Sequence, residues 1–521
     1  MYRNKGTITV FLSLISMLFL SLFCTMAESV RVQAARFQAA AAFDMGLFSI
    51  FGEYDRVLLE EYDLWFLDGS NEEQKIREVL ETKLEKYIQP NINPRYNLAA
   101  GRSWDVFPTE LDRCTVDKYA LATDHGGQVF YSQAVENQKE LFVGEAASAL
   151  KKNIKQMEEG HQKGEEYQNE EQKADEEYQR AQAAQMEEKK RQESEKENAE
   201  KQEESDIKET EAVQAKVENP LDQIKKIKSM GILGLVLKDG TVVSDKTIER
   251  KNLPSERNLQ KGSLLVNEIS ADPVSEAIFL NYLQKHFQCA VDEGGKHQKG
   301  SKEHSLSYEL EYIIGGQKSD RENLKKTVNR ILLIREGMNY ATLAKSAKMR
   351  GEAMALAAAI TGAAALPEFA GALQKLLMLA WAYGESLLDV RTLLAKGTVP
   401  MLKAETEWKL PLEKLGMLAE VLKECDAGGG NGQSYEDYLS GLLILGKKQQ
   451  RNLRVLDLIE CNRRMEKGGE TFRVDALVAQ AEASADFELA PVFLRVPAVW
   501  MHVRNQGTAY TIKGQYGYGQ P

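Results

Sequence analysis

Catalytic signatures are absent from this sequence of 521 residues. It has no Gly-x-Ser-x-Gly, no His-Glu-x-x-His and no Cys-x-x-Cys, the spacings typical of serine hydrolases, zinc proteases and redox or zinc sites. An excess of basic charge is missing too: the net charge is −11, which gives no reason to expect nucleic-acid binding. We therefore expect no enzyme activity, no cofactor and no catalytic residue, so location and assembly must indicate the function.

Cysteine is sparse for a chain of this length, with five residues at positions 24, 114, 289, 425 and 461. The first lies in an apolar run near the N-terminus, which leaves four for the rest of the chain. An even number permits disulfides in an oxidising exterior, but the spacing does not give a pairing. Disulfides and free thiols therefore both remain open.

The segment Thr7–Ala27 has no charged residue and is rich in Leu, Ile, Phe and Met. A helix needs ~20 such residues to cross the hydrocarbon core of a bilayer, so this segment is long enough to span it. Arg3 and Lys5 precede it and Glu28 follows it. The positive-inside rule then predicts that residues 1–27 are a cytoplasmic stub and a transmembrane helix in the cell membrane, and that the bulk of the chain is extracytoplasmic.

No glycine or proline occurs from Thr7 to Met45, so nothing in the sequence ends the helix at the membrane surface. We expect one helix from Thr7 to Phe51, roughly 65 Å long, with about half of it outside the membrane, the shape of a pilin spine. Cleavage after Ala27, which would make the apolar run a signal peptide, stays open because Thr25 and Ala27 are both small.

Two sets of residues on this helix are candidates for packing against other helices. The first, which we name the apolar stripe, recurs at spacings of three or four and so shares one helical face; it consists of Val30, Ala34, Phe37, Ala41, Met45 and Phe48. The stripe must be buried against something. The second set is Thr9, Ser13 and Ser16, whose small hydroxyl side chains allow close helix–helix approach in lipid. These three are equally consistent with polar residues that a long apolar helix tolerates.

Six runs carry a resemblance to a bacterial family. The first is the N-terminal run from "KGTITVFLSLISMLFLSLFC" to "YDLWFLDG", and the others are "NPLDQIKKIKSMGILGLVL", "LSYELEYIIGG", "DRENLKKTVNRILLIREGMNY", "LAWAYGESLLDVRTLLAKGTVPMLK" and "SYEDYLSGLLIL". The chain resembles a family of unknown function, found mainly in Gram-positive species and related to the TadE/TadG-like proteins of tight-adherence pilus assembly. The resemblance covers most of the chain apart from residues 151–219. It implies a membrane-anchored, non-enzymatic part of a type IV pilus-like or secretion apparatus, with pilin-like partners. Gly6 precedes the position of a prepilin cleavage, but Phe11 stands where prepilins have Glu, so cleavage after Gly6 stays open.

Acidic charge is concentrated in one low-complexity segment. Residues 151–220 contain 21 Asp or Glu and 13 Lys or Arg, a net of −8, and neither Leu nor Phe. Such a stretch buries too little apolar surface to offset the entropy cost of forming its own core. It can still be helical, because several Glu residues precede a Lys or Arg by four positions, which stabilises a helix. Its apolar residues do not follow a heptad repeat. We predict a solvated charged helix or flexible tether over residues 151–219, with Gly160 and Gly164 as breaks.

The remaining sequence predicts an α+β fold dominated by helices. Helical periodicity fills most of residues 320–463. Strands are predicted in "YALATDHGGQVFYSQAV", in "LSYELEYIIGG", in the C-terminal run after residue 470, and in "GILGLVLKDGTVVS" as a hairpin turning at Asp239-Gly240. If strands near both ends pair in one sheet, residues 28–150 and 220–521 form one ectodomain interrupted by the tether.

A second membrane span is not expected. The Ala-rich stretch from Met354 to Leu366 has about 13 residues before Pro367 and lies between Glu352 and Glu368, too few for a bilayer crossing. We expect a tightly packed buried helix instead.

One group of side chains resembles a metal site only loosely. It consists of His286, Cys289, His297 and His304, and imidazole and thiolate both bind zinc. The spacing matches no standard site, so the preferred interpretation is solvated loop histidines beside a buried cysteine, with no metal.

Glu385 and Asp389 lie four residues apart on a predicted helix and could divide acid and base roles. A structural pairing with Arg391 or Arg335 is the simpler interpretation.

Two function classes follow. The first is an extracytoplasmic structural or assembly protein that acts by packing, surrounded by membrane lipid and possible further copies of itself. The alternative is a membrane-tethered cell-envelope hydrolase, favoured only if these two carboxylates face an open pocket without a basic partner.

Overall fold

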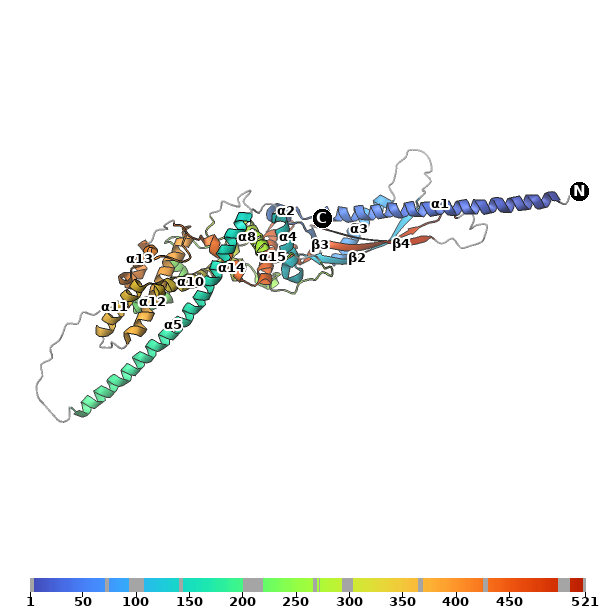
Figure 1. Cartoon of the computed structure of the whole chain (residues 1–521). Coiled ribbons are helices and arrows are strands. Elements are labelled where there is room, and N and C mark those ends of the chain that lie inside the picture. Colours follow the sequence, from blue (N-terminus) through green and yellow to red (C-terminus); the bar gives the residue numbers. More distant parts are fainter. Residues whose placement is uncertain are drawn as a thin grey trace. The chain divides into compact units, whose positions relative to one another are not determined.

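The structure is a computed structural model, and it describes residues 4–70, 75–92, 107–139, 144–199, 219–265, 269–270, 272–292, 303–363, 369–424, 430–494 and 507–518. The chain divides into two compact units (Figure 1). Unit 1 consists of Met1–Leu141, Lys251–Ser270 and Val455–Pro521, and unit 2 consists of Phe142–Arg250 and Ala271–Arg454. The predicted segment 220–521 thus contributes to both units.

Unit 1 begins with a single long helix, α1 (Asn4–Phe51). Its 48 residues run without a break, as the absence of glycine and proline up to Met45 predicts. Among the described residues it is the one helix that is long and apolar enough to cross a membrane. The continuous helix expected from the sequence is therefore confirmed.

The rest of unit 1 is built on an antiparallel sheet of four strands. These are β1 (Leu67–Asp68), β2 (Thr109–Leu121), β3 (Leu477–Leu489) and β4 (Thr508–Gly517). β3 pairs with each of the other three, and its long ladder with β2 runs from Thr109 opposite Leu489 to Leu121 opposite Val478. The expectation that strands near both ends of the chain share one sheet is confirmed.

Two helices, α1 and α3 (Ile76–Ile92), pack on the same face of this sheet (Figure 1). Alternate residues of β3 point toward them, and they are mostly small: Ala481, Ala483, Ala485 and Phe487. Close approach is also needed on β4, because a Cβ on Gly514 would lie 2.8 Å from Cε1 of Phe43. Small residues on the sheet therefore let α1 lie directly against it. The helices α2 (Arg56–Tyr62) and α4 (Asp124–Lys139) complete the N-terminal part of the unit.

Unit 2 is helical. Its helices are α5 (Gly144–Ala199), α6 (Pro220–Ser229), α7 (Ile232–Val236), α8 (Pro273–His286), α9 (Glu309–Gly315), α10 (Asp320–Lys345), α11 (Ala347–Ala363), α12 (Ala370–Leu394), α13 (Leu418–Glu424), α14 (Tyr435–Leu445) and the start of α15 (Lys448–Met465). α10 and α12 contact each other, and α5 packs along both. The predicted helical character of residues 320–463 is confirmed.

The acidic segment is not a solvated tether where α5 meets α10. The helix runs through Gly160 and Gly164, which the sequence analysis took as breaks. Both glycines are buried at the contact, and so are Met157, Tyr167 and Ala174. These positions follow a heptad spacing that a count of apolar residues misses, because two of its members are glycine. Residues 200–218 of the predicted tether lie outside the described residues.

Neither of two predicted strand pairs forms. In the first pair, residues 119–121 belong to β2, so that strand is confirmed, but a helix follows where its partner was expected. After β2, residues from Asp124 onward form α4, and the positive φ angles of Gly126 and Gly127 turn the chain into that helix rather than into a second strand. The predicted hairpin around Asp239-Gly240 contains α7, whose short apolar run is buried. A short apolar run fits a strand and a buried helix turn equally well, so periodicity alone could not separate them.

The predicted strand "LSYELEYIIGG" is the helix α9. Its polar positions, Glu309 and Glu311, are as buried as its apolar ones. Their carboxylates accept hydrogen bonds from the backbone N–H groups of Gln288 (3.0 Å) and Ala290 (2.8 Å). The acidic residues of this run are therefore buried and bind backbone N–H groups of the loop after α8. They do not form the exposed face of a strand.

The Ala-rich helix α11 is not buried as predicted. Only one side of it is buried, through Met349, Ala353, Ala357 and Thr361, and its main neighbour is α12. Most of the remaining surface of α11 is exposed. Alanine has a high intrinsic helix propensity, so these positions can be helical without being buried. Residues 364–368 of the predicted stretch lie outside the described residues.

Candidate interaction surface

Beyond the uncharged segment, α1 has a face that packs inside unit 1. Its residues Ala39, Ala42, Phe43, Leu47 and Ile50 are at most 4% exposed and belong to the core formed with α3 and the sheet. Gly46 lies on this face, where a Cβ would meet Cγ1 of Ile88 on α3 at 2.8 Å. This face is the one that stabilises the unit.

The apolar stripe lies on the opposite face of α1. All six of its residues, Val30, Ala34, Phe37, Ala41, Met45 and Phe48, are exposed. The exposed fraction is 70% at Val30 and 79% at Phe37. Phe48 alone has a recorded aromatic contact, edge-to-face with Tyr516 at 5.8 Å between ring centroids. The sequence thus identified a regular apolar face, which the described residues of the chain leave exposed.

The hydroxyl residues Thr9, Ser13 and Ser16 also lie on exposed surface of α1. The Ser13 hydroxyl donates to the carbonyl of Val10 at 2.8 Å, so its polarity is satisfied within the helix. A neighbouring helix could approach these small residues closely without leaving the Ser13 hydroxyl unbonded.

At the end of the uncharged segment, Glu28 and Arg31 form a buried ion pair. Arg31 also donates to the carbonyl of Ala490 at 2.8 Å, and the Glu28 carboxylate accepts from the N–H groups of Val492 (3.3 Å) and Phe493 (2.8 Å). Burial alone would raise the pKa of Glu28, but these hydrogen bonds and the Arg31 charge outweigh burial and lower it. In the sequence, Glu28 is recognisable only as a charge that flanks the apolar segment, and this clasp could not be predicted because its partners lie more than 450 residues away.

An apolar hollow of about 440 Å³ lies beside the clasp. Its α1 side is formed by Phe23, Met26, Ala27, Val30 and Ala34 around Arg31, and Phe107 and Phe493 line the rest. Val30 and Ala34 are stripe residues, so the hollow connects the uncharged segment with the stripe. The exposed apolar surface of α1 therefore continues from the segment that can span a membrane into unit 1.

The carboxylate pair of the alternative hypothesis is buried in unit 2. Glu385 and Asp389 of α12 have no exposed surface, and both contact the ammonium group of Lys403. Arg335 donates to Asp389 at 2.9 and 3.0 Å, and Asn339 donates to the same oxygen at 2.9 Å. The predicted pairing with Arg335 is confirmed, whereas Lys403 was missed.

This network opposes an acid–base role. Burial raises the pKa of Glu385 despite Lys403, whereas Arg335 and Lys403 outweigh burial at Asp389 and lower its pKa. Divergent pKa values can mark an acid and a base, but here both carboxylates are fully buried among the described residues and basic partners occupy both of them. The condition that would favour the hydrolase hypothesis is not met by these two residues.

The two described histidines of this group, His286 and His304, do not join Cys289 in a cluster of possible metal ligands. His304 contacts Glu309 at 2.8 Å, His286 packs on the ring of Tyr282, and His297 lies outside the described residues. The possible ligand atoms that do lie within 4.8 Å of one another are those of Cys289, Asp292 and Glu436. Burial and the nearby carboxylates of Glu311 and Asp292 raise the pKa of the Cys289 thiol, which disfavours the thiolate that a metal needs.

The four described cysteines, Cys24, Cys114, Cys289 and Cys461, are free thiols. Burial raises the pKa of the Cys114 and Cys461 thiols to about 12 in each case. Cys425 lies outside the described residues.

Comparison with known proteins identifies a family. A family of unknown function (DUF5702) matches residues 209–489, which is more than half of the chain. The chain belongs to this family. The matched region runs from the stretch before α6 to the end of β3, so it includes most of unit 2 and leaves α1 and α5 outside. No curated protein and no solved structure matches the chain.

Proposed function

We propose that this protein is a membrane-anchored, extracytoplasmic structural or assembly component of a type IV pilus-like (tight-adherence) or secretion apparatus. It acts by helix packing and protein–protein contacts. One observation carries this proposal: the apolar stripe of α1 is exposed while the opposite face of the same helix is already filled by α3 and the sheet. Exposed apolar surface of this extent is typical of an interaction site.

Residues Thr7–Ala27 anchor the chain, with lipid around the exposed apolar side chains of this segment. The positive charges of Arg3 and Lys5 keep the N-terminus in the cytoplasm, and both units then lie outside. This arrangement is that of a pilin-like subunit, in which one helix is both the membrane anchor and the spine of the folded domain.

The partner of the stripe is an apolar N-terminal helix of the same kind, anchored in the same bilayer and supplied by a pilin-like subunit. Ser16 and Thr9 precede Val30 by 14 and 21 residues, which are close to four and six helical turns of ~3.6 residues. They therefore fall on the side of α1 that carries the stripe. A parallel neighbouring helix could contact the hydroxyl residues within the membrane and the stripe outside it.

A charge in the stripe tests this proposal. Phe37→Asp should abolish co-purification with partner subunits from membranes, because an aspartate in an apolar helix interface is costly to desolvate. The fold should survive, since Phe37 is 79% exposed. Co-purification of a tagged copy, with partners identified by mass spectrometry, and circular dichroism of the purified variant measure the two effects. Recovery of an untagged second copy would identify a homo-oligomer.

Ser29→Asp is the matched control, because Ser29 is also exposed on α1 but does not share the three- or four-residue spacing of the stripe and is already polar. Assembly should be unchanged in this variant. Retained assembly in Phe37→Asp, or equal loss in both variants, would contradict the role of the stripe. The intact mass of the membrane-bound chain should include Thr7–Ala27, and a mature chain that begins at Glu28 would remove the anchor from the proposal.

A further inference from the structure

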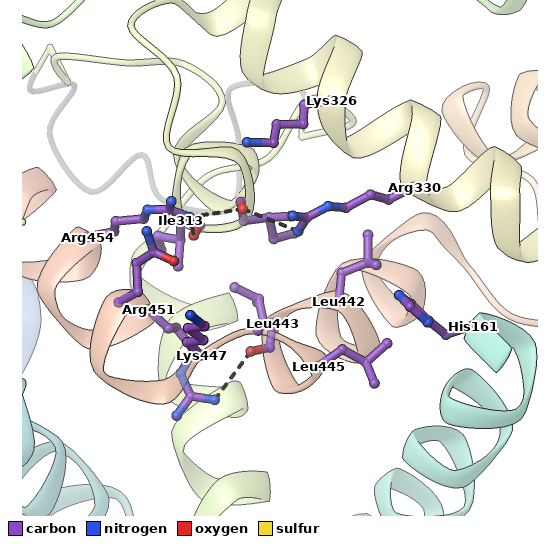
Figure 2. A pocket seen from close by; sticks show the side chains of 13 residues that line it. His161, Ile313, Lys326, Arg330, Leu442, Leu443, Leu445, Lys447, Arg451 and Arg454 are labelled. Atoms are coloured by element: carbon purple, nitrogen blue, oxygen red, sulfur yellow. Dashed lines mark hydrogen bonds between the residues drawn. The ribbon is translucent and has the colours of Figure 1, made fainter. Parts of the chain in front are cut away.

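A hollow of about 430 Å³ in unit 2 is lined by cations (Figure 2). Five basic side chains contribute to it, namely Lys326, Arg330, Lys447, Arg451 and Arg454, together with His161 of α5. None of the described residues that line it is acidic. Its apolar wall consists of Ile313 and Ile314 of α9 and of Leu442, Leu443 and Leu445 of α14.

Part of this cluster has a structural role. Lys326 donates to the carbonyl of Gly315 at 2.8 Å, Arg454 donates to those of Ile313 (2.9 Å) and Ile314 (3.0 Å), and Arg330 reaches the latter at 3.4 Å. These are the last carbonyls of α9, which its own backbone cannot satisfy. One or two basic side chains would be enough to satisfy these carbonyls. Neutral carbonyls do not cancel the charges of Lys326, Arg330 and Arg454, so these three side chains keep the hollow positive, whereas the charge of Arg451 is paired with Glu276.

The backbone that follows α9 fixes the position of the Arg454 guanidinium. Gly316 caps the C-terminus of α9 with a φ of 61°, and a Cβ at this position would lie 2.4 Å from Cζ of Arg454. Only glycine gives both the left-handed cap and the room for the Arg454 side chain. Arg451 is fixed as well, through its contact with buried Glu276 at 2.7 Å. The hollow is thus preorganised on at least two sides.

Burial and neighbouring positive charge both act on Lys326. Burial, and then the charges of Arg330, Arg454 and Arg250, lower the pKa of Lys326, whereas burial lowers the pKa of Arg330. A bound anion would relieve the repulsion between Lys326 and these charges. Guanidinium groups bind phosphate with paired N–H donors, and lysine adds a point charge.

We infer that this hollow is a binding site for a phosphate-bearing ligand, whose phosphoryl group contacts Lys326, Arg330, Lys447 and Arg454 and whose remaining atoms lie against the leucines of α14. The cavity is larger than a bare phosphate ion, and its apolar wall suits an organic ester. This site is independent of the proposed role of α1, because all of its residues belong to unit 2.

Isothermal titration of the full-length protein in a zwitterionic detergent tests the site, with phenyl phosphate and inorganic phosphate as separate probes. Phenyl phosphate should bind, and binding should weaken with added NaCl because the attraction is electrostatic. Tighter binding of phenyl phosphate than of inorganic phosphate would identify an organic ester. Equal affinity for both would keep the anion site and identify free phosphate as its ligand.

The double variant Arg330→Gln, Lys447→Gln should bind phenyl phosphate at least ~10-fold more weakly, since it removes two of the charges. Among the described residues, the one hydrogen bond of Arg330 is a long one to the carbonyl of Ile314, so both substitutions should leave the fold intact, as circular dichroism would check. Lys325→Gln is the matched control, because Lys325 is an exposed neighbour on α10 that does not line the hollow. The inference is overturned by no binding of either probe up to ~10 mM or by equal loss in the control.

Discussion

At the scale of single residues, Lys403 decides the role of the carboxylates on α12. Its ammonium group contacts both Glu385 and Asp389, and Arg335 neutralises the second carboxylate from α10. The charges of two carboxylates and two basic side chains therefore neutralise one another in a buried site. The spacing of the acids on one helix face was predictable from the sequence, but Lys403 follows α12 in an irregular segment, and no periodicity places it beside them.

Glu336 should make unit 2 lose stability as the pH rises. Burial raises the pKa of this carboxyl from its ordinary value of 4.5 to about 8, although Lys228 opposes the shift. The folded chain therefore keeps a proton that the unfolded chain releases. The stability from this group is fully present below pH ~4.5 and is lost as the pH rises through ~8. Glu336→Gln should remove this loss, on the order of a few kcal/mol.

Urea unfolding at about pH 5 and about pH 9, followed by the fluorescence of Trp381 and Trp408 in unit 2, measures the effect. The difference in unfolding free energy between the two pH values should be smaller in Glu336→Gln than in the unsubstituted chain. Glu413→Gln is an exposed control and should leave the difference unchanged. An unchanged difference in Glu336→Gln would show that this carboxyl does not hold a proton at neutral pH.

At the scale of elements, the glycines of α5 permit close helix packing, whereas glycines in loops interrupt helices. Gly160 and Gly164 look like helix breakers in an acidic run, but both are contact points of α5 with α10. A Cβ on Gly160 would meet Cγ2 of Ile334 at 2.7 Å, and one on Gly337 would meet the backbone nitrogen of Gly164 at 2.3 Å. Sequence alone could not separate these roles, because the reason for each glycine lies on another helix.

Gly337→Ala should therefore destabilise unit 2 by roughly 1–3 kcal/mol, despite the better helix propensity of alanine, because its Cβ would collide with backbone atoms that cannot rotate away. Urea denaturation measures the change. Gly351→Ala on α11 is the control, since nothing lies within 4 Å of its added Cβ. That variant should gain up to ~1 kcal/mol. A stabilised Gly337→Ala would mean that α5 and α10 are not packed this closely.

At the scale of the whole molecule, the sheet of unit 1 joins segments from both ends of the chain. β2 and β3 pair along most of their length although all of unit 2 lies between them in the sequence. The clasp of Glu28 and Arg31 with residues 490–493 adds a second connection of this kind. The N-terminal helix is therefore held by the last part of the chain.

Arg31→Ala should release the segment that follows β3. The substitution removes the hydrogen bond to Ala490 and leaves Glu28 buried without its cation, a loss of roughly 2 kcal/mol. Hydrogen exchange with mass spectrometry should show faster exchange at Val492 and Phe493. Arg36→Ala is the control, because Arg36 is exposed and its recorded contact is with the ring of Tyr510. Equal protection in the two variants would contradict the clasp.

The sequence by itself determined the continuous helix from Thr7 to Phe51, the helical stretch from residue 320 to 463 and the presence of C-terminal strands. These features depend on local composition and periodicity, which a single chain segment carries. Tertiary structure alone decided which face of α1 is buried, because two faces were apolar and only the sheet selects one. It also decided that α9 is a helix with buried acids, and it assembled the cationic hollow, because both depend on groups that separate segments bring together.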